Sequence, residues 1–276
     1  MKIGMLMLRY PPEHESLVMS GVIRYLSEWG AEVDVIYPEE EVIRLETVRP
    51  EHDLYVLKSR TEMALGLAGM LHAAGAAILN PYPVSAMLRD RITTTRTLMA
   101  AGVPVPDTMV TARPEKLAPL LSEGPLAIKH FRGSMARGIH VVWDAEELDG
   151  VPSNQGPVFA QRFLTSMGIM RRVYAISGQV FGVRTNLYAG TYDEKVGEAF
   201  TLTPLMHEVA HRCGEAFGIE VFGLDVIEDG EDVYVVDVHS FPSFKGVPDA
   251  SLRLADYIYH TARRVMKGEP IIAKRV

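Results

Sequence analysis

Two carboxylates and an imidazole stand inside two apolar segments near the end of the chain. Asp237 and His239 alternate with valines in "VVDVHS", so both side chains point to one face of the expected strand. The turn signal Asp229-Gly230 makes "VFGLDVIE" its antiparallel partner and brings Asp225 close to Asp237. Adjacent carboxylates repel unless a cation lies between them, and oxygen ligands suit Mg²⁺. The pattern predicts a metal site, with a solvated acidic strand end as the alternative.

A lysine inside an apolar strand and the loop after it form a candidate site for phosphate. Lys129 lies in "LAIKHF", where burial without a partner is costly, and a phosphate would remove that cost. The loop "RGSMARG" at 132–138 could bring backbone N–H groups against phosphate oxygens. It is not a Walker loop, because neither Lys-Ser/Thr nor a helix follows. The alternatives are an edge-strand lysine that faces water and an ordinary hairpin turn.

Two arginines lie on the hairpin that precedes the acidic strands. Arg172 stands in "MRRVYAI", and Arg184 stands near the end of "VFGVRTN". A guanidinium can neutralise phosphate charge through two parallel hydrogen bonds. For each arginine the alternative is a surface ion pair.

The elements that must position these residues change character along the chain. The first third alternates between strand and helix, which favours a mostly parallel sheet. Strands are expected at 2–8, 32–38, 53–59 and 76–80, and helices at 16–30, 62–75 and 85–102. The remainder reads as antiparallel α+β, with a small hairpin lobe and a larger lobe. Its expected strands are 124–131, 138–144, 157–164 and the hairpins around Ser177-Gly178 and Asp229-Gly230, and its helices are 203–218 and 249–268.

Composition narrows the class of protein. The 276 residues carry a net charge of −7 with no visible basic stripe, so no nucleic-acid partner is expected. The single cysteine, Cys213, rules out an internal disulfide. No apolar run approaches the roughly 18 residues of a membrane span, and the N-terminus lacks the features of a signal peptide. We therefore expect a cytoplasmic enzyme or binding protein without a membrane partner.

The order of these segments resembles the ATP-grasp superfamily. The segments are "RDRITTTRTLMAAGVPVP", "LAIKHFRGSMARGIHVV", "FAQRFL", "RRVYAI" with "VFGVR", and "GLDVIEDGEDVYVVDVHSFPSFKGV". The likeness is closest to the ribosomal-protein glutamate ligase type and to the inositol trisphosphate kinase-like branch, which "FPSFKGVP" resembles especially. It covers essentially the whole chain. It implies an ATP-grasp fold with an N-terminal parallel α/β pre-ATP-grasp domain at 1–86, a central lobe at 87–162 and a C-terminal lobe at 163–276.

The resemblance also implies roles for individual residues. ATP would be held by two cations, a flexible lid and an inter-lobe hinge, at Arg91, Lys129, Gly133, Ser134, Gly138, Gln161, Phe163 and Leu164. Arg172 and Arg184 would lie near the transferring phosphoryl group. The metal would be held by Asp225, Asp237 and His239. By position in the chain, the acceptor side would be lined by Lys58, Ser59, Arg60, Lys245 and Gly246.

Three departures from the family pattern accompany this likeness. Arg91 replaces a lysine, and no carboxylate follows the hinge in "QRFLTSMGIM", where the ribose partner usually stands. His239 stands where the family usually has asparagine. Nitrogen is a less favourable ligand for Mg²⁺ and a better one for Mn²⁺. The expected cofactors are therefore ATP and Mg²⁺, with Mn²⁺ as an alternative metal.

The first functional hypothesis is an ATP-dependent carboxylate–amine ligase that forms an amide or peptide bond through an acyl-phosphate. The second is an ATP-grasp kinase that phosphorylates a small polyol such as an inositol phosphate. The third is a nucleotide-binding protein without catalysis. The expected partner is a small-molecule or peptide substrate. Because relatives commonly form dimers and tetramers, a homo-oligomer is also among the expectations.

Overall fold

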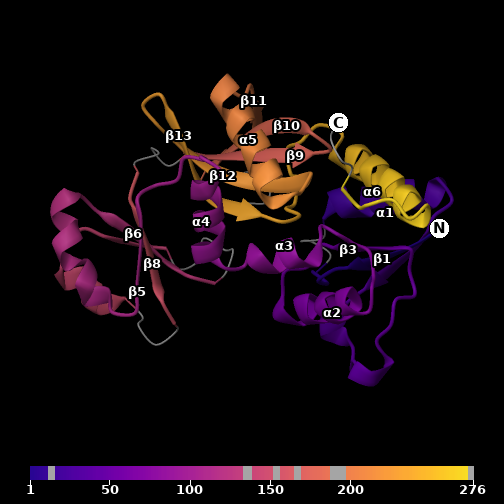
Figure 1. The fold of residues 1–276 in the computed structure, drawn as a ribbon. Helices are drawn as coiled ribbons and strands as arrows, with labels where there is room; N and C mark the ends of the chain where they lie inside the picture. The colour runs from indigo at the N-terminus through magenta and orange to yellow at the C-terminus, as the bar shows by residue number, and fades with distance from the viewer. Residues whose placement is uncertain (12–15, 133–138, 152–155, 165–168, 187–196, 273–276) are drawn as a thin grey trace.

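Three β-sheets and the helices packed on them make up the described part of the chain (Figure 1). The structure is a computed structural model, and it describes residues 1–11, 16–132, 139–151, 156–164, 169–186 and 197–272. The mixture of one parallel and two antiparallel sheets agrees with the expected α/β and α+β character.

The N-terminal sheet is parallel, with strand order β2-β1-β3-β4. Its elements are β1 (Lys2–Leu6), α1 (Leu17–Glu28), β2 (Glu32–Ile36), η2 (Pro38–Glu40), η3 (Leu45–Thr47), β3 (Leu54–Leu57), α2 (Glu62–Ala73) and β4 (Ile78–Leu79). Ser16 and Thr61 begin α1 and α2 as N-caps, because each side chain accepts a hydrogen bond from the backbone of the first turn. The short segment 58–60 therefore lies after the carboxyl end of β3, between the strand and the cap of α2.

The prediction of a single helix at 85–102 is wrong. Two helices occupy this region, α3 (Tyr82–Met87) and α4 (Arg91–Ala100). Asp90 starts the second, since its Oδ1 accepts hydrogen bonds from the backbone N–H groups of Ile92 and Thr93 at 2.9 and 3.1 Å. The break puts Arg91 in the first turn of α4, and its backbone N–H donates to the carbonyl of Phe131 at 2.9 Å. The start of α4 is thereby fixed to the central sheet.

The central sheet is antiparallel, with strand order β5-β8-β6-β7. Its elements are β5 (Thr108–Thr111), η4 (Pro114–Glu123), β6 (Leu126–His130), β7 (His140–Val142), η5 (Glu146–Gly150) and β8 (Val158–Arg162). Leu126, Ile128 and Ala160 share one face and are buried with Leu117 of η4. Because side chains alternate along a strand, Lys129 is on the opposite face.

The third sheet is antiparallel, with strand order β11-β10-β9-β12-β13. Its elements are β9 (Ile169–Ile176), β10 (Gln179–Asn186), β11 (Glu198–Phe200), α5 (Pro204–Phe217), β12 (Val221–Asp229) and β13 (Asp232–His239). The hairpins predicted around Ser177-Gly178 and Asp229-Gly230 are both confirmed. Helix α5 buries one face of this sheet through a cluster that includes Val209, Cys213, Leu224 and Val226.

The closing helix, α6 (Ala250–Met266), packs beside α1 although it comes from the far end of the chain (Figure 1). Ser251 Oγ donates to the carbonyl of Val18 at 3.0 Å, and Leu254 and Ile258 are buried in the same core as Ile3. One hydrophobic core thus joins the N-terminal sheet to the C-terminal region. The domain boundaries given above stay predictions.

Helix α6 is also the longest described helix, at 17 residues. Its buried residues include Leu254, Tyr257 and Ile258, whereas Arg263 and Arg264 stand in its last turn. Among the helices that the structure describes, none combines the length and the apolar character needed to cross a membrane.

Candidate active site

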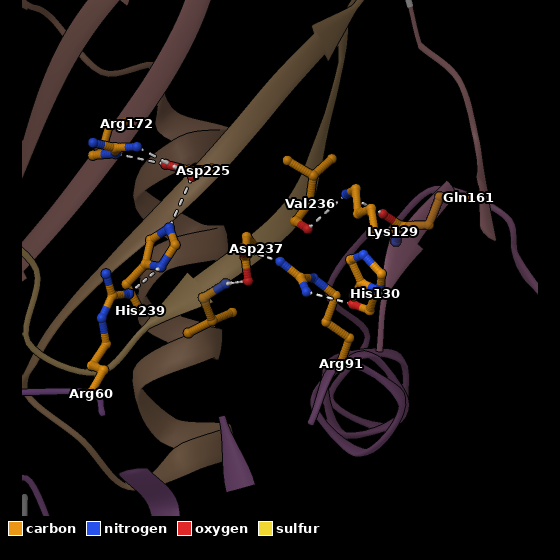
Figure 2. A network of polar contacts seen from close by, with 11 residues as sticks. Arg60, Arg91, Lys129, His130, Gln161, Arg172, Asp225, Val236, Asp237 and His239 are labelled. Atoms are coloured by element: carbon orange, nitrogen blue, oxygen red, sulfur yellow. Dashed lines mark hydrogen bonds and ion pairs between the residues drawn. The ribbon is translucent and has the colours of Figure 1, made fainter. Parts of the chain in front are cut away.

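Side chains from all three sheets meet in one network of polar contacts (Figure 2). Arg60 comes from the end of β3, Arg91 from the start of α4, and Lys129 from β6. The third sheet contributes Arg172 from β9, Asp225 from β12, and Asp237 and His239 from β13; Gln161 comes from β8. Residues far apart in the sequence are therefore held at one place by the fold.

Asp225 and Asp237 lie directly opposite each other on neighbouring strands. The juxtaposition expected from the Asp229-Gly230 turn is confirmed, and Arg172 pairs with Asp225 on the other side. The register shifts after Asp225, so that Val226 pairs with Val235 and Val236 is left as the extra residue of a β-bulge. This bulge leaves the carbonyl of Val236 outside the pairing with β12, where Lys129 reaches it.

Lys129 is a buried cation that contacts neutral oxygens. Its Nζ donates to Gln161 Oε1 at 2.7 Å and to the carbonyl of Val236 at 3.3 Å, and only 9% of the residue is exposed. Burial lowers the pKa of Lys129 to about 8, against the opposing attraction of Asp237. The alternative of an edge-strand lysine facing water is wrong, because β6 lies between β8 and β7. Carbonyl oxygens hold the ammonium group in place without cancelling its charge.

Asp225 is held from two sides. Arg172 Nε donates to Oδ1 at 2.7 Å and Nη2 donates to Oδ2 at 3.3 Å, while His239 Nε2 lies 2.9 Å from Oδ2. Burial would raise the pKa of Asp225, but His239 and Arg172 outweigh it and hold the pKa well below its usual range. Asp225 is therefore a carboxylate across the physiological pH range.

Arg91 joins the central sheet to the third sheet. Its Nη1 donates to the carbonyl of His130 at 2.6 Å, and its Nη2 donates to Asp237 Oδ2 at 3.2 Å. Its Nε is buried and has no hydrogen-bond partner among the described residues. Arg91 therefore keeps one buried N–H donor that no described residue uses.

The network carries more positive than negative charge. Four cations, Arg60, Arg91, Lys129 and Arg172, surround the two carboxylates in Figure 2. The whole chain, by contrast, has a net charge of −7. A local excess of partly buried positive charge attracts anionic ligands such as phosphate groups.

The carboxylates fit a metal ion that is shared with a substrate. A carboxylate has roughly four lone-pair positions. Three of those on Asp225 and two of those on Asp237 accept hydrogen bonds, the latter from Arg91 and from the backbone of Val238. In the described ranges no three His, Cys, Asp or Glu residues are grouped to hold a metal. The donor set therefore fits Mg²⁺ that takes its remaining ligands from phosphates and water.

Phe163, one of the predicted hinge residues, lies beside an aromatic residue that sequence reasoning missed. The backbone N–H of Phe163 donates to the carbonyl of Pro125 at 3.0 Å. The rings of Phe163 and Trp143 meet edge to face, with centroids 6.1 Å apart, and 59% of Trp143 is exposed. The available signal was a tryptophan directly after the strand expected at 138–144. Gly133, Ser134 and Gly138 of the predicted lid lie outside the described residues.

The predicted acceptor-side residues have separate environments. Lys58 Nζ donates to the carbonyl of Phe241 at 3.1 Å, and burial together with Arg60 lowers its pKa to about 7. Ser59 is buried, with its Oγ 3.2 Å from Oγ1 of Thr61. Lys245 and Gly246 are half-buried and are not part of the network in Figure 2.

Arg184 is not brought to this network. It pairs with Arg171 across the β9–β10 hairpin, whereas Arg172 pairs with Val183, so the two arginines lie on opposite faces of the sheet. Arg184 is half exposed and forms an ion pair with Glu198 at 2.9 Å. This is the surface ion pair given above as the alternative, and the catalytic role of Arg184 remains a prediction that its position does not support.

The two arginines predict a contrast in activity. Arg172→Ala should lower kcat about 100-fold or more, because it removes a partly buried charge that contacts Asp225. Arg184→Ala should leave kcat within about threefold, since surface ion pairs contribute little. Steady-state ADP release by the purified variants measures both. Equal losses in the two folded variants would show that the faces were assigned wrongly.

Comparison with known proteins agrees with this geometry. The family model described as "RimK-like ATP-grasp domain" matches residues 88–259, which is more than half of the chain. The chain belongs to the RimK-like ATP-grasp family. A protein of Thioalkalivibrio sulfidiphilus named "Probable alpha-L-glutamate ligase" is 22% identical over 273 residues, covering 91% of this chain and 88% of that protein. The resemblance of the sequence to ATP-grasp proteins of the glutamate ligase type is thereby confirmed.

Solved structures show the same fold. The RimK domain ATP-grasp protein from Sphaerobacter thermophilus superposes with a TM-score of 0.75 at 20% identity, covering 94% of this chain and 100% of that one. The ATP-grasp ligase PsnB, complexed with minimal precursor, Mg and ADP, gives a TM-score of 0.67 at 18% identity, covering 95% and 96%. The predicted ATP-grasp fold is confirmed. The expected enzyme class agrees with the family model and with the name of the Thioalkalivibrio protein.

Proposed function

We propose that this protein is an ATP-dependent carboxylate–amine ligase of the RimK-like ATP-grasp family. The observation that carries the proposal is the cation-rich network around Asp225 and Asp237, which draws residues from all three sheets. Similarity to an alpha-L-glutamate ligase and to the PsnB fold supports ligation rather than another use of ATP. The substrates would be an acidic small molecule or peptide and an amine.

The reaction has two steps in this proposal. A carboxylate oxygen of the acceptor attacks the γ-phosphorus of ATP, and ADP leaves with the electron pair of the broken P–O bond. An amine then attacks the acyl-phosphate carbon, forms the C–N bond, loses a proton and displaces inorganic phosphate. Both steps move negative charge between oxygens, so fixed cations lower the barriers most effectively.

Each residue of the network has a task in these steps. Lys129 and Arg91 would bind the nucleotide phosphates, and Arg172 would face the transferring phosphoryl group. Asp225 and Asp237 would hold Mg²⁺, which neutralises charge on the phosphates when bound. Arg60, and Lys58 when it is protonated, would attract the acceptor carboxylate, because both are partly buried and their described hydrogen-bond partners are not carboxylates. Lys245 and Gly246 would also line the acceptor side.

The adenine site in this proposal lies at the hinge formed by Phe163 and Leu164. Trp143 then becomes a stacking surface beside the base. Replacing Trp143 by Ala should weaken ATP binding about 10-fold, since stacking of one base on an aromatic ring contributes on that order.

Fluorescence reports the same contact directly. The chain has two tryptophans, and Trp29 stands at the end of α1, stacked on Tyr25. In a Trp29→Phe variant, ATP should therefore quench the remaining emission from Trp143. ATP binding seen by calorimetry without any change in that emission would place the base elsewhere.

One product assay tests the proposed function against its rivals. The protein is incubated with ATP and Mg²⁺, first with mixtures of amino acids and acidic peptides, and then with polyols. ADP formed together with a new amide supports the ligase. A phosphorylated polyol would support the kinase, and binding of ATP without turnover would support a non-catalytic protein. Use of Mn²⁺, a cytoplasmic location and a homo-oligomer stay predictions.

A further inference from the structure

His239 has a hydrogen-bond partner on each ring nitrogen. Arg60 Nη1 lies 3.1 Å from Nδ1, and Asp225 Oδ2 lies 2.9 Å from Nε2, while 7% of the His239 side chain is exposed. A guanidinium can only donate, so Nδ1 must accept. The carboxylate of Asp225 can only accept, so Nε2 must carry the proton. The two partners fix the tautomer and the orientation of the ring (Figure 2).

This arrangement leaves no nitrogen lone pair for a metal. The lone pair of Nδ1 faces Arg60, and Nε2 uses its proton on Asp225. To bind a cation, the ring would have to release one of these buried groups. The carboxylates, in contrast, keep lone pairs that no hydrogen bond given above between described residues uses, two on Asp237 and one on Asp225.

We propose that His239 is a positioning residue and not a metal ligand: it holds Arg60 on the acceptor side and orients Asp225, and the ligands that the protein gives to the metal are carboxylate oxygens. The inference rests on the proposed function, because it assigns the metal and the acceptor anion to this network. The inference assigns different ligands to different residues of the network. Asp225 and Asp237 face the cation, and Arg60 faces the acceptor.

Arg60 is suited to the acceptor side by its environment. His239 is its one hydrogen-bond partner in the part of the chain that the structure describes. Burial lowers its pKa, and the charge of Asp237 opposes that effect. Its other N–H groups remain available, so the guanidinium can bind a carboxylate or phosphate oxygen while His239 keeps it in place.

Metal coordination is tested by pulsed electron paramagnetic resonance. Mn²⁺ and ATP are added to the wild type and to His239→Gln, and the echo modulation from directly bound nitrogen is compared. The expected result is the same spectrum for both proteins, without imidazole nitrogen. Nitrogen modulation that is present in the wild type and disappears in His239→Gln would overturn this inference but not the proposed function. Failure of the wild type to bind Mn²⁺–ATP would overturn the proposed function with it.

The link to Arg60 is tested with inorganic phosphate, the second product of the proposed reaction. Calorimetry measures its binding to the protein loaded with Mg²⁺ and ADP. His239→Leu and Arg60→Ala should each weaken phosphate binding about 10-fold, and the double variant should lose no more, because both remove one coupled contact. The affinity for ADP without Mg²⁺ should stay within about twofold of the wild type, because neither variant changes Lys129 or Arg91.

A matched variant separates positioning from damage to the fold. In His239→Gln the amide oxygen can accept from Arg60 and the amide N–H can donate to Asp225. Phosphate binding should therefore return to within about twofold of the wild type. Additive losses in the double variant, unchanged binding in His239→Leu, or no phosphate binding by the wild type would each overturn the inference.

Discussion

Asp237→Asn should lower kcat about 1,000-fold while the protein stays folded. Asparagine has almost the same shape, and its side-chain oxygen can still accept from Arg91 or from the backbone of Val238. What is lost is one of two negative charges that face each other across β12 and β13. Removing a fixed charge from a phosphoryl-transfer site costs on the order of 10²–10³-fold or more in rate. Initial rates of ADP release with saturating ATP and Mg²⁺ measure the loss.

Asp232 offers a matched control for this variant. It begins the same strand and is exposed, so Asp232→Asn changes the net charge equally without entering the network. It should retain wild-type activity. If Asp237→Asn keeps kcat within tenfold of the wild type and melts at the same temperature, Asp237 does not serve the reaction.

Lys129→Met should weaken ATP binding about 100-fold. Methionine fills most of the lysine volume but cannot donate to a phosphate. A hydrogen bond to a charged group contributes about 1.5–3 kcal/mol, and each 1.4 kcal/mol corresponds to a tenfold change in affinity. Titration calorimetry with ATP and Mg²⁺ gives the comparison. Lys116 lies at an exposed position of η4, the helix that packs on the central sheet, so Lys116→Met should bind ATP with the affinity of the wild type.

The same lysine predicts a pH dependence of stability. Burial holds the pKa of Lys129 at about 8, below the value near 10.5 expected for the unfolded chain. Between these values the unfolded chain binds more protons, so wild-type stability rises with pH. Relative to Lys129→Met, the wild type should gain roughly 3 kcal/mol in unfolding free energy from pH 7.5 to 10.5. Urea titrations at several pH values measure the unfolding free energy of both proteins. If these free energies change equally with pH, the assignment of Lys129 as a buried cation is contradicted.

Local sequence signals were sufficient to find the hairpins but not every pair within them. Counting from the Asp229-Gly230 turn puts Asp225 near Asp237 but directly opposite Val236, and the bulge at Val236 is what brings Asp237 opposite Asp225. The same counting around Ser177-Gly178 would have put Arg184 opposite Arg171 and away from Arg172. A shared hairpin does not by itself place both arginines at the site, because strand alternation puts their side chains on opposite faces.

Other features depend on contacts that no local pattern contains. The bulge at Val236 gives Lys129 a carbonyl partner 107 residues away, and Arg60 meets His239 across 179 residues. Asp90 stands within an otherwise helical pattern, so its role as a cap that starts α4 was not separable from a helix interior. The sequence thus predicted the parts of the site, while the partners of each cation came from the way the sheets pack.

Oxygen-18 transfer tests the central claim most directly. Acidic peptides and amino acids labelled with oxygen-18 in their carboxylates are incubated with the protein, ATP, Mg²⁺ and a mixture of amines, and the inorganic phosphate is analysed by mass spectrometry. If ATP activates a carboxylate as an acyl-phosphate that an amine then cleaves, one labelled oxygen should appear in each phosphate released with the amide. Amide formation that releases only unlabelled phosphate, or ADP formation without any amide, would contradict the account.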